Sequence, residues 1–151
     1  MQDILIKRVT NVNADFKNLV ALLDQSLAIT DGDEHGFYDQ YNGLEEIHHA
    51  VVAYLNRIPV ACGALKKWST TAVEIKRMYT LPEYRGRGLG SQIIAHLANW
   101  TKELGYTRMV LETGKRQPDA IALYEKNGFV RIPNYEPYAG MENSVCFEKM
   151  L

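Results

Sequence analysis

The spacing of apolar positions in the first part of the chain predicts a strand followed by a helix. Residues 4–9 form a short, largely apolar run that is typical of a strand. Asn13 can cap the helix, because the apolar side chains after it recur every three or four positions. These side chains are Phe16, Leu19, Val20, Leu23 and Leu27. A polar segment with several acids and aromatics follows at 30–42, and we expect it to connect the helix to the next strand.

The middle of the chain predicts an antiparallel meander that leads into a long helix. Residues 49–55 and 59–67 flank a turn at Asn56-Arg57, and a third strand covers 72–81. From Gly88 the apolar spacing becomes helical and ends at Gly105, a residue suited to a helix C-terminus. The apolar stripe of this helix consists of Ile93, Ile94, Leu97, Trp100 and Leu104.

The last third of the chain predicts strands that alternate with a second helix. The expected elements are a strand at 108–111, a helix at 118–126 that stops at Asn127-Gly128, and strands at 129–132 and 144–150. Two strands that flank a helix imply a crossover, so we expect a mixed α/β sheet covered by helices. The chain shows no repeat or linker-like stretch, which favours a single domain over residues 1–151.

Composition limits the cellular compartment and the binding partners that we expect for this chain. A chain of 151 residues with 46% hydrophobic side chains can fold without a disulfide or a metal. Cys62 and Cys146 stand in strand-like runs and are expected to pack as free thiols, which indicates a reducing, cytoplasmic setting. No segment resembles a signal peptide or a membrane span, so no membrane contact is expected. The chain has 17 basic and 18 acidic residues, which gives no general attraction to nucleic acid.

Metal binding is also not expected from the sequence. The four histidines have no zinc-ligand spacing, and no pair of cysteines accompanies them.

The sharpest feature is the glycine-rich segment 81–91, which joins a strand to the long helix. Gly86, Gly88 and Gly90 leave the backbone free of Cβ atoms, so several N–H groups can converge on a pyrophosphate at the positive end of the helix. Arg85 and Arg87 add charge-assisted donors. The plainer alternative is a glycine-rich turn that only begins a helix.

Two other phosphate-binding loops do not fit this segment. A dinucleotide-binding fingerprint requires glycine at the position of Ser91. A Walker loop requires Gly-Lys-Ser/Thr after four intervening residues, and this run is absent.

The run 85–90, Arg-Gly-Arg-Gly-Leu-Gly, resembles the Gln/Arg-x-x-Gly-x-Gly/Ala signature of the GNAT superfamily of N-acetyltransferases. The strand before it, the helix after it and the segment 120–129 follow in the order that the family shows, and the resemblance is strongest over 72–132. It implies a mixed, mostly antiparallel sheet of about six or seven strands, with splayed central strands and flanking helices. It also implies acetyl-CoA as the co-substrate, with the pyrophosphate on the loop and the pantetheine arm beside the preceding strand.

The resemblance assigns the coenzyme contacts to two segments and one isolated residue. Gln117 stands where many relatives have Asn. The full set of expected coenzyme-binding residues is Met78, Tyr79, Thr80, Arg85, Gly86, Arg87, Gly88, Leu89, Gly90, Ser91 and Gln117.

Acetyl transfer to an amine needs a group that takes the proton of the amine and a donor for the departing thiolate. Tyr124, four residues before Gly128, occupies the position of the usual general acid of the family. A phenol with a pKa near 10 is protonated at neutral pH and can donate to a thiolate. The alternative is a tyrosine that only packs on its helix.

Two carboxylates are candidates for the general base. The offset of Glu112 from Gln117 resembles that of the base in some N-terminal-amine acetyltransferases of the family. Glu74 lies eleven positions before Arg85, an offset used by some lysine acetyltransferases of the family. Alternatively, each carboxylate is only solvated or salt-bridged, and a chain of water molecules accepts the proton of the amine instead. Glu112 is slightly favoured as the base, because it ends the strand that leads towards Tyr124.

The acceptor site is expected on the segment after the first helix. Glu34, His35 and Tyr38 supply acids and aromatics that suit a cationic amine, and Tyr135 and Tyr138 are candidates for the other side of the pocket. The alternative is a polar loop that its aromatic side chains anchor to the core.

The function expected is transfer of an acetyl group from acetyl-CoA to a primary amine by direct attack in a ternary complex. A small molecule, an amino-acid-like compound and a protein amine are all open as acceptors, as is a homodimer. A catalytically silent acyl-CoA-binding module is the alternative. A nucleic-acid-binding domain lacks both a motif and the net charge.

Overall fold

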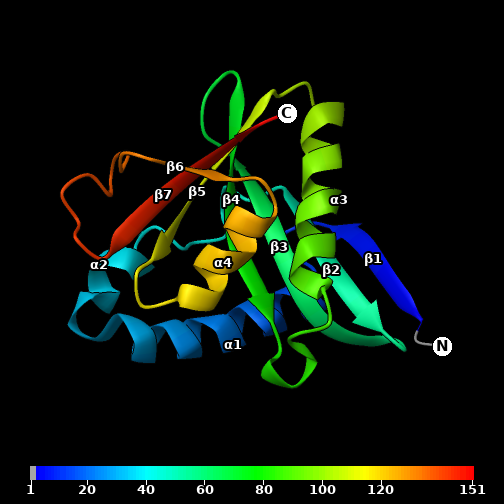
Figure 1. Ribbon diagram of the computed structural model, residues 1–151. Helices are drawn as coiled ribbons and strands as arrows, with labels where there is room; N and C mark the ends of the chain where they lie inside the picture. Colours follow the sequence, from blue (N-terminus) through cyan, green and yellow to red (C-terminus); the bar gives the residue numbers. More distant parts are fainter. Residues whose placement is uncertain (1–2) are drawn as a thin grey trace.

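The computed structural model describes residues 3–151, and within them seven strands form one sheet in the order β1-β2-β3-β4-β5-β7-β6 (Figure 1). The strands are β1 (Ile4–Val9), β2 (His49–Leu55), β3 (Ile58–Lys67), β4 (Ala72–Thr80), β5 (Arg108–Gly114), β6 (Val130–Ile132) and β7 (Ser144–Met150). The helices are α1 (Ala14–Asp31), η1 (Gly32–Glu34), α2 (His35–Asp39), η2 (Pro82–Tyr84), α3 (Leu89–Glu103) and α4 (Pro118–Lys126). The predicted mixed, mostly antiparallel sheet is confirmed, since β4 and β5 form its parallel pair.

Helices cover both faces of this sheet. On β2, Val51 and Ala53 pack in the cluster that includes the α3 side chains, whereas Ala50 and Val52 pack with α1. Figure 1 shows α3 and α4 in front of the sheet and α1 beneath its other face. Two covered faces explain why β2 and β3 are apolar almost without alternation.

The turn between β2 and β3 follows the sequence prediction. Asn56 and Arg57 have φ values of 50° and 72°, so both adopt the left-handed conformation that a two-residue hairpin turn requires. Asn tolerates this conformation better than most residues, and its side chain accepts a hydrogen bond of 3.0 Å from the backbone N–H of Asp3.

The segment 30–42 differs from the polar connection that the sequence predicts, because most of it is helical. Helix α1 continues to Asp31, and η1 and α2 follow directly. The aromatic side chains of this segment explain its order: Phe37 and Tyr41 pack with the buried Tyr38 against Tyr138 and Cys146. Their burial outweighs the polar character of the remaining side chains.

The central strands separate, and this separation creates the site. Parallel pairing of β4 with β5 is limited to three residue pairs that end at Glu74↔Val110. Further along β4, a bulge shifts its register against β3, and Arg77 there has a φ of 59°. The Arg77 side chain is 1% exposed and forms an ion pair with Asp24 of α1. This pair ties α1 to the bulge.

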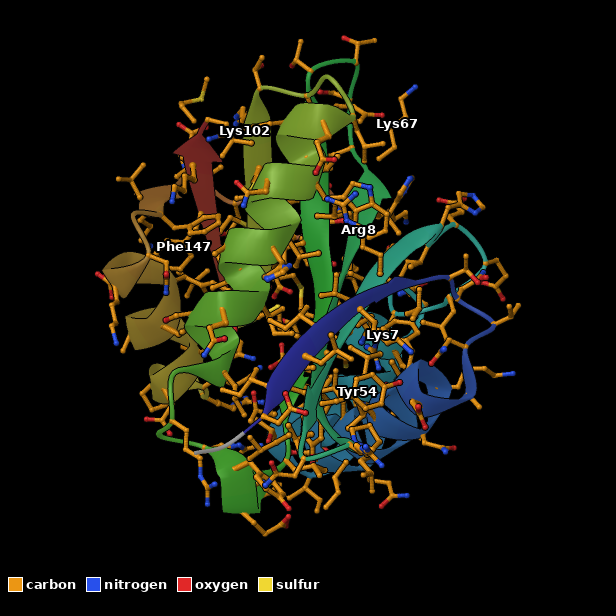
Figure 2. All side chains as sticks on the ribbon, turned by 90° about the vertical axis from the view of Figure 1, so that its right-hand side faces the viewer. Lys7, Arg8, Tyr54, Lys67, Lys102 and Phe147 are labelled. Atoms are coloured by element: carbon orange, nitrogen blue, oxygen red, sulfur yellow. The ribbon has the colours of Figure 1, made fainter. Side chains whose placement is uncertain are left out.

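The edge strand β1 lies beside α3, on the side of the molecule away from this separation. Figure 2 shows Arg8 of β1 close to α3, where it pairs with Glu103 and lies over the Trp100 ring at 4.6 Å. Both members of the ion pair are exposed, so it adds little stability by itself.

Candidate active site

A cavity of about 810 Å³ lies where β4 and β5 separate. Residues of α1, β4, the glycine-rich loop, α3, β5 and α4 line it, and they include most of the residues that the sequence predicts for the site. Those predicted residues are Tyr38, Met78, Tyr79, Thr80, Arg85, Gly86, Gly88, Leu89, Gly90, Ser91, Glu112, Gln117, Tyr124 and Tyr138.

The glycine-rich loop forms one end of this cavity. Gly86 and Gly88 have φ values of 77° and 81°, which side chains rarely adopt, and no atom lies within 4 Å of the position a Cβ would take. Gly88 caps α3 without a side-chain hydrogen bond, and the first N–H groups of a helix have no partner within it. The open backbone and the positive helix end together fit a pyrophosphate such as that of coenzyme A.

Gly90 has a second role that the sequence analysis missed. A Cβ on Gly90 would lie 2.9 Å from Cδ2 of Leu123. Gly90 therefore lets α3 and α4 approach closely. This contact places α4 beside the cavity, of which the glycine-rich loop forms one end.

The two arginines of the loop differ in position. Arg85 lines the cavity, donates a hydrogen bond of 2.9 Å from Nε to the Thr80 carbonyl and lies over the Tyr79 ring. Arg87 lies over the Tyr84 ring at 5.1 Å and is not among the cavity-lining residues. The structure thus holds one of the two predicted cationic donors at the cavity wall.

Within the described residues, the side of β4 that faces β5 has no paired strand beyond Glu74. Met78, Tyr79 and Thr80 line the cavity in this stretch, where β5 pairs with β7 and no longer with β4. An unpaired strand edge can hydrogen-bond the two amides of a pantetheine arm as it would a further strand. Gln117, whose side chain makes no capping hydrogen bond with the described residues at the start of α4, also lines the cavity.

Tyr124 reaches the cavity from α4. The residue is 6% exposed, and its ring packs on Phe129 and Phe147 with centroid distances of 5.8 and 6.4 Å. Among the residues that the structure describes, none forms a hydrogen bond with its hydroxyl. Burial, with a smaller effect of Glu112, raises the pKa of Tyr124 above its ordinary value, so the phenol stays protonated at neutral pH.

The two candidate bases lie in different surroundings. Glu112 of β5 lines the cavity, and burial raises its pKa to about 7, although the Ser144 side chain and the Lys76 ammonium oppose this shift. Glu74 is buried outside the cavity lining and accepts a hydrogen bond of 2.7 Å from the Tyr135 hydroxyl. Glu112 therefore faces the cavity with a pKa near neutral, whereas Glu74 does not line the cavity.

The predicted acceptor residues separate into two groups. Tyr38 and Tyr138 line the cavity, and the Tyr38 hydroxyl lies 2.8 Å from Ser144 Oγ. The remaining three, Glu34, His35 and Tyr135, are not among the lining residues.

Each of these three has its own partner. Glu34 pairs with Arg116 at 3.1 Å, and His35 Nδ1 lies 3.4 Å from the Asp31 carboxylate. Tyr135 is engaged with Glu74. Their contacts support the wall of the site.

Several polar residues that line the cavity, among them Lys76, Arg116 and Asn143, were not predicted as site residues, whereas Asp31 lies in the segment expected to hold the acceptor. For Lys76 a signal was available, since it stands two positions after Glu74 and so on the same face of β4. Asn143 belongs to a segment that approaches the cavity through tertiary contacts, so no local pattern marks it.

Among residues 3–151, no helix is both long and apolar enough to cross a membrane. The same part of the chain holds no group of three or more His, Cys, Asp or Glu side chains arranged to bind a metal ion.

A sheet that opens beside a glycine-rich, anion-binding helix start is the arrangement of acyl-CoA-dependent acyltransferases. The sequence pattern of the Acetyltransferase (GNAT) family matches residues 16–129. The chain belongs to this family, as the loop at 85–90 predicts.

Similar proteins agree with this assignment. The chain is 36% identical over 92 residues to the uncharacterized N-acetyltransferase YsnE of Bacillus subtilis, and the match covers 60% of this chain and 61% of the relative. The chain thus spans about three fifths of the length of this curated relative. A Klebsiella pneumoniae protein provisionally titled an acyl-CoA N-acyltransferase is 30% identical, with a TM-score of 0.81 over 98% of this chain and 97% of that one.

A third protein has the same fold at lower identity. A GNAT family acetyltransferase from Elizabethkingia anophelis, solved with acetyl-CoA bound, has a TM-score of 0.72 and 21% identity, and the match covers 98% of each chain.

Proposed function

We propose that this protein transfers the acetyl group of acetyl-CoA to a primary amine by direct attack, with Glu112 as general base and Tyr124 as general acid. The observation that carries the proposal is that one cavity joins the anion-binding loop to both of these side chains. The acetyl-CoA bound to the Elizabethkingia protein of the same fold supports the choice of co-substrate.

In this proposal the loop 86–91 takes the pyrophosphate, and the free edge of β4 takes the pantetheine amides. These contacts direct the thioester towards the part of the cavity that holds Tyr124. Binding energy from a distant part of the coenzyme then serves to orient the reacting atoms.

The reaction needs two proton movements. The amine nitrogen attacks the thioester carbonyl carbon, the C–S bond breaks, and Glu112 accepts the proton that the nitrogen loses. The Tyr124 hydroxyl donates a proton to the departing thiolate. Its raised pKa favours return of a proton to the phenolate before the next cycle.

Release of coenzyme A with a panel of primary amines tests the proposal. A thiol-reactive dye can follow the product, because Cys62 and Cys146 are both buried and contribute little background. We expect release above the amine-free rate with at least one amine, and mass spectrometry should find the acetylated product. A catalytically silent binding module would instead bind acetyl-CoA in calorimetry and show only the amine-free rate with every amine.

A further inference from the structure

Lys76 of β4 is a buried cation whose contacts with the described residues are long. Its side chain is 9% exposed and lines the cavity. Nζ donates a hydrogen bond of 3.4 Å to the Tyr138 hydroxyl and lies 3.9 Å from Glu74 Oε1, and these are its hydrogen bond and its ion pair among the described residues. An ammonium group carries three donors, and ion pairs with good geometry are shorter than these contacts.

Such a cation is costly unless an anion compensates it. Burial lowers the pKa of Lys76, while the carboxylates of Glu74 and Glu112 act in the opposite direction. Glu74 accepts the 2.7 Å hydrogen bond of Tyr135 on Oε2, and its other oxygen, Oε1, lies 3.9 Å from Lys76 Nζ, which is too far for a close ion pair. Lys76 therefore keeps N–H donors for a further anion. Because Lys76 lies on the cavity wall, a bound ligand can supply that anion.

The other buried cation on this wall is already paired. Arg77 forms its ion pair with Asp24 of α1. At the other side of the cavity, Arg116 donates to the Asp31 carbonyl at 2.9 Å and pairs with Glu34. These contacts leave Lys76 as the buried cation best placed to bind a ligand in the described chain.

Lys76 faces Glu112 across the separated strands. The register pairs Glu74 of β4 with Val110 of β5, so two further residues along each strand lead to Lys76 and Glu112 on the same face of the sheet. The carboxylate of Asp31 lines the same cavity. The cavity thus carries a cationic group on one strand and an acidic group on the other.

We propose that the acceptor is an amine that carries its own carboxylate, an amino acid, which binds Lys76 through the carboxylate and presents its amine to Glu112. The Tyr138 hydroxyl, which accepts from Lys76, has its own proton free to donate to the same carboxylate. This inference rests on the proposed acetyl transfer and narrows its substrate. An internal protein lysine carries no carboxylate near its amine and would leave Lys76 without a partner.

Matched substrates test this directly. Initial rates of coenzyme A release are compared for free alanine, leucine, phenylalanine and glutamate, and for the α-carboxamide of each. We expect kcat/KM for at least one acid to exceed that of its amide by tenfold or more. The amine of an amide is less basic and is more often neutral at pH 7, so the comparison is biased against the prediction.

Variants assign the preference to one residue. Lys76→Met should reduce the ratio of acid to amide kcat/KM to within about threefold of one, mainly through a higher KM for the acid. Lys76→Arg should keep part of the preference. Lys102→Met removes an exposed lysine on α3, on the side seen in Figure 2, and should leave the ratio unchanged. Acetyl-CoA binding by calorimetry checks that each variant is folded.

Three outcomes separate the possible failures. If the wild-type protein acetylates acids and amides equally well, or uses only amines without a carboxylate, the substrate class is overturned and acetyl transfer stands. If Lys76→Met binds acetyl-CoA and keeps the wild-type ratio, Lys76 is not the carboxylate site. If no amine of any kind raises coenzyme A release, the proposed function itself fails.

Discussion

Tyr135 donates a hydrogen bond of 2.7 Å from its hydroxyl to Oε2 of Glu74. Glu74 is one of the two candidate bases, and neither it nor Tyr135 is among the residues that line the cavity. Glu112 faces the cavity on the neighbouring strand, with its pKa raised to about 7 mainly by burial. The proposal therefore assigns the proton of the amine to Glu112.

Replacing each carboxylate by its amide separates the two roles. Glu112→Gln should lower kcat at pH 7 by on the order of a hundredfold, because the amide keeps the size of the side chain but cannot take a proton. Part of the loss should be recovered at high pH, where more of the amine is neutral. Glu74→Gln should lower kcat by less than about fivefold, since its amide oxygen can still accept from Tyr135.

Steady-state rates from pH 6 to pH 10 for the wild type and both variants provide this comparison. Equal loss in the two variants would remove the distinction between Glu112 and Glu74. Wild-type rates and pH dependence in both would point to a water chain as the proton acceptor.

Tyr124→Phe should retain acetyl-CoA affinity and lower kcat by on the order of a hundredfold, as for loss of a general acid. The hydroxyl has no hydrogen-bond partner in the described chain, so its removal should change the melting temperature little. Calorimetry and single-turnover rates measure the two effects. Unchanged single-turnover chemistry would exclude Tyr124 from the mechanism.

Charge at the start of α3 should govern coenzyme binding. Gly88→Glu and Gly88→Gln impose the same strain at a φ of 81°, but only Glu sets a negative charge against the pyrophosphate. We expect Glu to weaken acetyl-CoA binding at least tenfold more than Gln does, and the difference should shrink at high salt. Equal affinities of two folded variants at low salt would contradict the assignment of the loop.

The stability of the fold should report the buried Glu112 independently of any substrate. Its folded-state pKa of about 7 lies above the ordinary value of 4.5, so the full stability is present below pH 4.5. As the pH rises to 7 and beyond, the unfolded chain releases its proton first and the folded state loses about 3 kcal/mol relative to it. Glu112→Gln should lack this loss.

Urea unfolding at pH 5 and pH 8 measures the difference. Other titrating groups affect both proteins alike, so the change in the free energy of unfolding between the two pH values is compared for the wild type and the variant. The same change in both would show that Glu112 is ionised normally in the folded protein.

Local sequence patterns determined the order of the elements and the position of the phosphate loop. Glycines between a strand and an amphipathic helix specify backbone conformation over a few residues, and Gly86 and Gly88 adopt the left-handed conformation that the loop needs. The meander and its turn at Asn56-Arg57 could likewise be predicted, because they depend on residues that are close in the sequence. Family membership could be predicted because the motif lies within one such segment.

Tertiary structure alone decided the chemistry of the cavity. The sequence favours Glu112 over Glu74 only slightly, and the clear difference between them arises because Glu112 lines the cavity whereas Tyr135, 61 positions away, binds Glu74. The partly satisfied charge of Lys76 and the packing of Gly90 on Leu123 likewise depend on strands and helices that meet from distant parts of the chain. The charge and pKa of an ionisable group depend on its burial and neighbours, and only the folded chain brings those neighbours together.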